Sequence, residues 1–377
     1  MKILINAMSA KTGGIETYTN NLARSLSERN VNVTFALSHD FSLDVDVPVI
    51  RLSADRMSPL RRAIWEQTVW RQIVVKHKPD VLYSSANFGI LAPPVSQVLL
   101  VREGGLFDPF YLTNIAPSLN VTAMFERIAR RELILASARA SRAVLTPTEA
   151  MKNLLLSWAG KSGARVQVNH YGTISNFSNT GPHIRQWKEG GTLKLFYISA
   201  YYPHKQPGLI SEAVAQLNAQ GIPCELTLTM DLEQIANTVG GDKDHFLLSK
   251  GIQRGQLTMV GKIPYKELPE MCNGHDLFIF PSLSETFGHP LVEAMSVGIP
   301  IIASDTPVHR EVCEDSALYF SPLLPSDLVR QIRALDDNET MRDTLIKRGK
   351  KMVKINYMWE SHVDRLLDIF AEVSKNP

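Results

Sequence analysis

The sequence predicts an α/β protein with two doubly wound, Rossmann-like domains. The chain has 377 residues, more than one ordinary core organises. Short apolar runs alternate with helical patterns, as in parallel sheets covered by helices. The stretch 173–192 is rich in Ser, Thr, Asn and Gly and lacks periodicity, which indicates a linker. We therefore expect an N-terminal domain over 1–175, a linker over 176–192, a C-terminal domain over 193–357, and a last helix over 358–375 able to pack back on the first domain.

The first half contains six apolar runs that predict strands: Lys2–Asn6, Val31–Leu37, Asp80–Ser84, Gln97–Val101, Ala143–Thr146 and Arg165–Asn169. Between the first two, apolar residues recur at helical spacing: Ile15, Tyr18, Leu22, Ala23 and Leu26. The run Thr146-Pro147-Thr148-Glu149 predicts a capping box with proline at the first helical position.

The second half repeats this alternation. The runs that predict strands are Leu193–Ser199, Glu225–Met230, Gln256–Gly261, Asp276–Pro281, Ile299–Ala303 and Ala317–Phe320. Helices are expected over 208–220 and 265–273, and in the tail, where one apolar stripe comprises Val363, Leu366, Leu367, Phe370 and Val373. Two such domains would create a cleft facing the carboxyl ends of their strands.

Composition excludes several classes of protein. With 40 basic and 38 acidic side chains, the net charge of +2 gives no argument for nucleic-acid binding. The three cysteines match no metal spacing and are expected to be small buried residues. No signal peptide and no membrane span is recognised, so we expect a cytoplasmic protein. Contact with a membrane surface stays open.

The most informative stretch is 276–295. A buried strand ends in a polar loop, a helix begins near Pro290, and Gly298 with Pro300 ends it. Two carboxylates, Glu285 and Glu293, flank a helix N-terminus that offers free N–H groups to phosphate. Because carboxylates repel phosphate, they should bind sugar hydroxyls of the same ligand, a nucleotide sugar. Otherwise Glu293 only complements the dipole from the first helical turn and Glu285 is a solvated loop residue.

These motifs resemble the GT-B glycosyltransferases, specifically the retaining family four, over essentially the whole chain and most strongly in its second half. The most specific element is the pair Glu285 and Glu293, eight positions apart within residues 281–295. Its companions are Gly298–Asp305, Glu311, Ala317–Pro322 and Trp359.

The resemblance implies roles for the residues of this loop. Glu285 would bind the donor sugar and Glu293 the ribose. The loop that would hold the phosphates comprises Phe287, Gly288, His289 and Pro290.

The segment after the first strand of the second domain carries a further part of the pattern. Lys205 matches a lysine that neutralises the diphosphate, whereas Ala200 stands where the family usually has an arginine. A protonated His204 could compensate. An exposed, solvated lysine is the competing interpretation of Lys205.

Three further loops are picked out by the resemblance. Gly13 and Gly14 would lie against the donor phosphate, although a plain turn also explains them. Gly261 belongs to a loop near the base. The family's usual histidine after the fourth strand is absent, and Arg102 and Glu103 stand there as cleft candidates. Arg102 could contact phosphate or a charged acceptor, with an ordinary surface ion pair as the alternative.

The resemblance implies transfer of a hexose from a UDP- or GDP-sugar to a saccharide or lipid-linked acceptor, without metal or other cofactor. The alternatives are a non-catalytic nucleotide-sugar-binding protein, motivated by the missing arginine and histidine, and a sugar-nucleotide epimerase. The basic segment 59–78 is interpreted first as a domain helix with a solvated face, and second as a membrane-docking helix.

Overall fold

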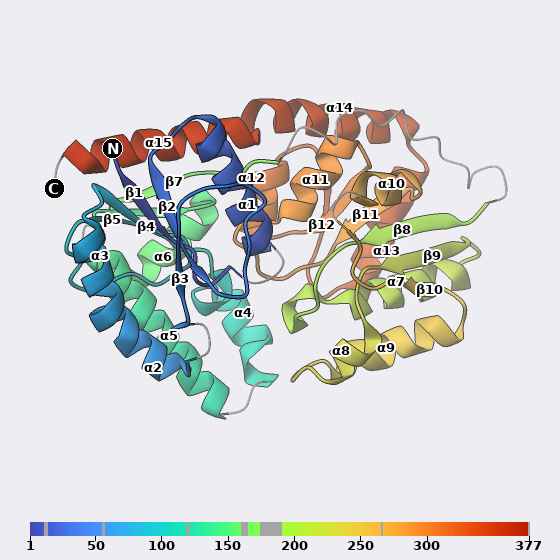
Figure 1. Cartoon of the computed structure of the whole chain (residues 1–377). Coiled ribbons are helices and arrows are strands. Elements are labelled where there is room, and N and C mark those ends of the chain that lie inside the picture. Colours follow the sequence, from blue (N-terminus) through green and yellow to red (C-terminus); the bar gives the residue numbers. More distant parts are fainter. Residues whose placement is uncertain are drawn as a thin grey trace. The chain divides into compact units, whose positions relative to one another are not determined.

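The computed structural model describes residues 1–10, 14–54, 57–118, 121–159, 165–173, 191–264 and 267–375. The chain divides into two compact units (Figure 1). Unit 1 comprises Met1–Phe107, Phe125–His170 and Glu360–Pro377, and unit 2 comprises Asp108–Met124 and Tyr171–Trp359.

Unit 1 is built on a seven-stranded parallel sheet in the order β3-β2-β1-β4-β5-β6-β7. Its strands are β1 (Ile3–Asn6), β2 (Val33–Ser38), β3 (Val49–Leu52), β4 (Val81–Ser84), β5 (Ser96–Leu100), β6 (Ala143–Thr146) and β7 (Val166–Val168). The strand order reverses between β1 and β4, where Ile3 pairs with Val33 on one side and Val81 on the other. In open α/β sheets, ligands bind beyond the carboxyl ends of the strands at such a switch point.

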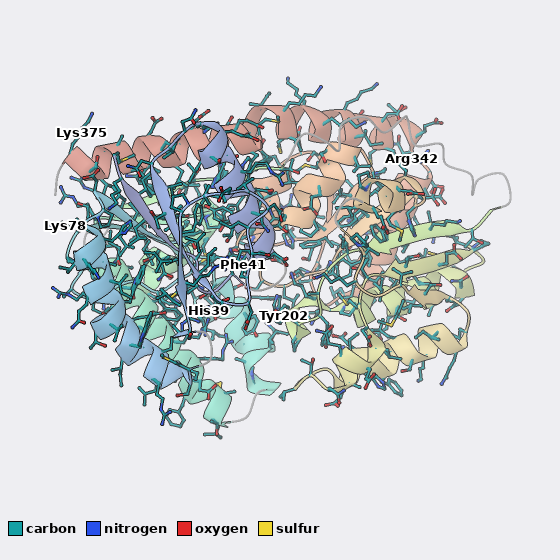
Figure 2. The ribbon with its side chains drawn as sticks, viewed as in Figure 1. His39, Phe41, Lys78, Tyr202, Arg342 and Lys375 are labelled. Carbon is teal, nitrogen blue, oxygen red and sulfur yellow. The ribbon has the colours of Figure 1, made fainter. Side chains whose placement is uncertain are left out.

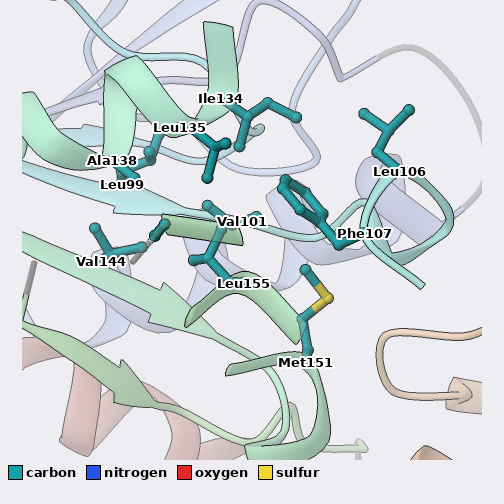
Figure 3. Close-up of a cluster of buried hydrophobic side chains, with 11 residues drawn as sticks. Leu99, Val101, Leu106, Phe107, Ile134, Leu135, Ala138, Val144, Met151 and Leu155 are labelled. Carbon is teal, nitrogen blue, oxygen red and sulfur yellow. The ribbon is translucent and has the colours of Figure 1, made fainter. Parts of the chain in front are cut away.

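Helices flank this sheet. They are α1 (Gly14–Glu28), α2 (Pro59–Trp65), the π-helix η2 (Glu66–Trp70), α3 (Arg71–His77), the 3-10 helix η3 (Gly104–Leu106), most of α5 (Val121–Ala140), α6 (Glu149–Ala159) and α15 (Trp359–Lys375). Figure 3 shows part of the core, where Phe107, Ile134 and Leu155 pack with Leu99 of β5.

Unit 2 contains a six-stranded parallel sheet in the order β10-β9-β8-β11-β12-β13. Its strands are β8 (Leu193–Tyr197), β9 (Cys224–Leu228), β10 (Leu257–Met259), β11 (Leu277–Phe280), β12 (Ile301–Ser304) and β13 (Leu318–Phe320). Its helices are α4 (Pro109–Asn114), η4 (Ala116–Ser118), η7 (Pro203–Lys205), α7 (Pro207–Ala219), α8 (Leu232–Ala236), α9 (Asp242–Gln253), α10 (Leu268–Asn273), α11 (His289–Val297), α12 (Pro307–Cys313), α13 (Pro325–Asp336) and α14 (Glu339–Asn356). The switch point lies between β8 and β11.

The doubly wound fold class is confirmed, and all twelve expected strands are present, eleven of them with shifted ends. The edge strand β3 is absent from the prediction, because its four residues are half-buried or exposed and lack a buried apolar run. The expected capping box is wrong. Thr146 ends β6, and the side chain of Thr148 accepts the Met151 N–H at 3.1 Å, so α6 begins two residues later than expected.

The domain limits show two further differences. Most of the expected linker, residues 174–190, lies outside the described residues. Residues 108–124 belong to unit 2, whereas the sequence places them in the first domain. The tail helix belongs to unit 1, where Phe370 packs on Tyr83 with ring centroids 5.2 Å apart.

Candidate active site

The switch point of unit 2 brings together two charged residues that are 80 positions apart in the sequence. Lys205 ends η7 in the segment after β8, and Glu285 lies in the loop after β11. Because β8 and β11 are adjacent, these loops leave the same edge of the sheet. The ammonium of Lys205 donates a hydrogen bond to Glu285 Oε1, and the Leu283 N–H donates to the His204 carbonyl at 2.8 Å. The competing interpretation, in which Lys205 is an exposed and solvated lysine, is therefore wrong.

The pair is largely withdrawn from solvent, with side-chain exposures of 12% for Lys205 and 14% for Glu285. Burial raises the pKa of the Glu285 carboxyl, but the charges of Lys205 and His204, together with hydrogen bonds from Lys205 and Ser282, lower the pKa to about 2. Glu285 is consequently ionised at neutral pH and can only accept hydrogen bonds.

The N-terminus of α11 follows the same loop. Gly288 precedes it with φ of +83°, a conformation that disfavours residues with a side chain. This turn starts α11 at His289, one residue before Pro290, so Glu293 lies in the second turn. The expectation that Glu293 belongs to the first turn is wrong, and so is its interpretation as a first-turn partner of the dipole. Gly298, with φ of +95°, ends the helix as expected.

A cluster of aromatic side chains packs around Phe287 and His289, at the junction of this loop and α11. Phe287 is buried and makes edge contacts with Tyr171 and Tyr357, and His289 stacks on Tyr171 with ring centroids 4.9 Å apart. The side chain of Phe287 is thus an anchor, which leaves only its backbone to face a ligand.

The segment after β8 carries a second aromatic group, which adds Tyr202 and Tyr111 to the candidate His204. The ring of His204 stacks on Tyr202, labelled in Figure 2, and is tilted against Tyr111 of α4. Ala200 is exposed and supplies no charge. Lys205 and His204 are therefore the basic groups beside Glu285 in this segment.

Family models match both halves of the chain. The model described as Glycosyl transferases group 1 matches residues 183–352, and that described as Glycosyltransferase Family 4 matches residues 12–173. O-antigen chain mannosyltransferase RfbU from Salmonella typhimurium (strain LT2) is 35% identical over 283 residues, covering 74% of this chain and 72% of that protein. The chain belongs to the group 1 glycosyltransferases. The expected glycosyltransferase family is confirmed, and retention of configuration stays a prediction.

Solved structures share the GT-B fold with this glycosyltransferase. Sucrose-phosphate synthase from Thermosynechococcus elongatus has a TM-score of 0.80 at 15% identity, covering 100% of both chains. Anabaena Alr3699/HepE in complex with UDP and glucose has a TM-score of 0.73 at 17% identity, covering 98% of this chain and 99% of that chain. Matches to some curated relatives span as little as 32% of their length.

The glycosyltransferase carries its other candidate residues elsewhere. Gly13 lies outside the described residues, and Gly14 opens α1 with open space where a Cβ would lie. Gly261 follows β10 with φ of +69°. Arg102 and Glu103 follow β5 in unit 1.

Glu103 and Arg102 differ in their partners. Glu103 pairs with Arg130 at 2.7 Å. The Arg102 N–H donates to Asn87 Oδ1 at 2.7 Å, and its guanidinium forms no ion pair with the described residues.

Within the described ranges, no group of three or more His, Cys, Asp or Glu side chains is arranged to hold a metal ion. None of the described helices combines the length and apolarity that crossing a bilayer requires.

Sequence reasoning also missed two serines and a histidine in or beside the loop 281–288, which follows β11 and carries Glu285 (the glutamate loop). Ser282, Ser304 and His309 are buried and joined by hydrogen bonds. Only their polarity within otherwise apolar runs could have drawn attention to them.

Proposed function

We propose that this glycosyltransferase moves a hexose from a nucleoside diphosphate sugar to a hydroxyl of a saccharide or lipid-linked acceptor, with retention of anomeric configuration. The observation that carries the proposal is the shielded Lys205–Glu285 pair at the switch point of unit 2, next to the N-terminus of α11. The 35% identity to RfbU favours a mannosyl donor and a role in bacterial surface polysaccharide assembly. The nucleotide of the donor is a separate choice, for which the HepE complex with UDP and glucose supports UDP.

The chemistry follows from the charges. The bond between the sugar and the diphosphate breaks, the acceptor oxygen bonds to the anomeric carbon, and the leaving phosphate takes the acceptor proton. Lys205 and the positive end of the α11 dipole would stabilise the growing charge of the diphosphate. Glu285, held ionised, would accept hydrogen bonds from sugar hydroxyls, and Glu293 from the ribose. In this proposal these groups act on the diphosphate without a metal ion.

The test combines binding with turnover. We expect one class of UDP- or GDP-sugar to raise the melting temperature, because it binds the native state alone. We expect slow donor hydrolysis without acceptor and transfer with it. Binding without turnover would instead support a non-catalytic binding protein, and a sugar altered while still attached to the nucleotide would support an epimerase.

Glu285→Ala tests the central residue. We expect transfer to fall at least about 100-fold, in line with loss of an electrostatic group used in the transition state. Circular dichroism should show the native fold retained. The matched control is Glu314→Ala, on the loop after α12. Near-normal transfer by the Glu285 variant would remove this residue from the site.

We also propose that the enzyme lies in the cytoplasm, at the inner side of a membrane. It would dock through a surface of unit 1 on which exposed apolar side chains lie among basic ones. This face comprises Leu60, Ile64, Val75, Leu91, Phe125, Ile128 and Leu133, all exposed. The loop 89–92 connects its two halves. Gln67 of η2 accepts the Leu91 N–H at 2.7 Å, and Ser137 of α5 donates to the Gly89 carbonyl at 3.4 Å.

Charge selects the partner of this face. Segment 59–78 has five basic residues and one acidic residue, and α5 has four and two, although the whole chain carries only +2. Apolar side chains among basic ones fit an anionic lipid surface. The solvated basic helix expected from the sequence is thus accompanied by exposed apolar residues, of which Ile64 is 58% and Phe125 69% exposed.

Vesicle co-sedimentation tests the docking. Wild-type enzyme should bind vesicles of phosphatidylglycerol better than those of phosphatidylcholine, and less at high salt. Ile64→Ser and Phe125→Ser should each weaken binding about tenfold, since a buried Ile or Phe contributes about 1.5–3 kcal/mol. The matched controls Ile355→Ser and Phe246→Ser, 62% and 55% exposed on unit 2, should not. Equal losses in all four variants would reject this face.

A further inference from the structure

A buried histidine lies beside the glutamate loop. His309 is in the first turn of α12, whose N-cap Thr306 accepts the His309 N–H through its side chain at 3.3 Å. The imidazole is fully buried, and its edge packs on Phe280 of β11 with ring centroids 5.1 Å apart. An apolar side chain would fill such a position without desolvating two ring nitrogens, so the imidazole needs another explanation.

The ring nitrogens of His309 have distinct roles. Nδ1 lies 2.8 Å from the Ser304 carbonyl oxygen, and a carbonyl only accepts, so Nδ1 carries the proton. Nε2 is buried and has no hydrogen-bond partner among the described residues. The imidazole is therefore neutral and attached by one nitrogen to the last residue of β12.

The contacts continue from β12 to the glutamate loop. Ser304 Oγ lies 3.1 Å from His309 Nδ1 and donates to the Ser282 carbonyl at 2.5 Å. The Ser282 hydroxyl donates to the Ser284 carbonyl at 3.4 Å, next to Glu285, and this hydroxyl also helps to lower the pKa of the Glu285 carboxyl. One connected set of contacts thus runs from the imidazole through two buried serines into the backbone of the loop that carries Glu285.

We infer that His309 is a positioning residue, which holds the end of β12 against the loop 281–284 so that Glu285 points at Lys205 and at the donor sugar. This inference rests on the proposed function. It acts through Ser304 and Ser282, and His309 itself needs no contact with substrate. A group held in place before the donor arrives loses less entropy in the transition state, which is why displacement of Glu285 should slow transfer.

Two substitutions separate positioning from packing. His309→Asn keeps an amide N–H where Nδ1 lies and leaves a cavity. His309→Leu fills the space better and offers no donor. If His309 only packs, both the stability and the activity of the leucine variant should be higher than those of the asparagine variant. If it positions Glu285, we expect kcat/KM at least tenfold below wild type in the leucine variant and within threefold in the asparagine variant, although asparagine melts lower.

A second buried histidine supplies the control. His275 stacks on Phe196, and its Nδ1 contacts the Met271 carbonyl at 2.6 Å, but it precedes β11 at the opposite end of the strand from Glu285. His275→Leu should lower the melting temperature and leave kcat/KM within twofold of wild type.

The crystal structure of His309→Leu gives a readout that does not depend on turnover. We expect the loop 281–284 to shift and the Lys205–Glu285 contact to break. An intact contact, or an activity order that follows the melting order, would overturn the inference. If wild-type enzyme transfers no sugar, the proposed function fails, and the loop geometry in this variant still decides the role of His309.

Discussion

At the scale of single residues, the site depends on which groups stay charged after burial. Glu285 is ionised because Lys205 and His204 offset its burial, and His309 is neutral because nothing offsets its burial sufficiently. The same sheet edge therefore holds a carboxylate that only accepts hydrogen bonds and an uncharged imidazole. Acid protonates both groups and so ends both states.

The pH dependence of stability follows from these two groups. Burial lowers the pKa of the His309 imidazole to about 4, against raising effects of the Glu285 carboxylate and the Ser304 carbonyl. The unfolded chain takes up this proton near pH 6.5 and the native protein only near pH 4, so the stabilisation is present above pH 6.5 and is lost between 6.5 and 4. The loss is about 3 kcal/mol at most. The contribution of Glu285 is lost lower, between about pH 4.5 and 2.

Urea denaturation at pH 7.5, 6, 5 and 4 measures this slope. The His309→Leu variant should lack the loss of stability between pH 6.5 and 4. The comparison is His362→Leu, which removes a buried histidine of unit 1. Parallel slopes for wild type and His309→Leu would contradict the neutral state of this imidazole.

At the scale of elements, the start of α11 decides where phosphate could lie. The helix begins at His289 because Gly288 turns the chain in the left-handed region. A Cβ on Gly288 would lie 3.1 Å from Leu291 Cδ1, so both backbone strain and crowding oppose any other residue.

Gly288→Ala should therefore lower stability by about 1–2 kcal/mol and weaken donor binding, because the first N–H groups of α11 would be displaced. Gly221→Ala provides the control, since Gly221 has φ of +79° and open space around a Cβ. Its variant should show comparable strain with unchanged donor affinity. Calorimetric titration with the donor separates the two. Unchanged affinity for the Gly288 variant would argue against phosphate at this helix.

At the scale of the whole molecule, the last helix completes unit 1 from the far end of the sequence. On α15, His362 contacts the His170 carbonyl and Tyr18, and Phe370 packs on Tyr83. Unit 1 therefore needs residues from both ends of the chain. How the two units face each other, and the cleft expected between them, stay predictions.

Phe370→Ala should lower the stability of unit 1 by about 3–5 kcal/mol, as expected for an emptied aromatic site in a core. Asp368→Ala, exposed on the same helix, should change it little. Calorimetry should show the loss in the unfolding transition that donor binding does not shift directly. A loss in the donor-stabilised transition would instead place this contact's effect in unit 2.

The sequence by itself determined the α/β class, every strand except β3, and the family, because these depend on local apolar patterns and on a contiguous motif around Glu285 and Glu293. It could not reveal that Lys205 and Glu285 bond each other, that Phe287 is an anchor, or that His309 is neutral. Those properties depend on strand order and burial, which only the tertiary structure decided. Pairing across 80 positions arises because β8 and β11 are neighbours in the sheet, and burial then sets the charge of each group.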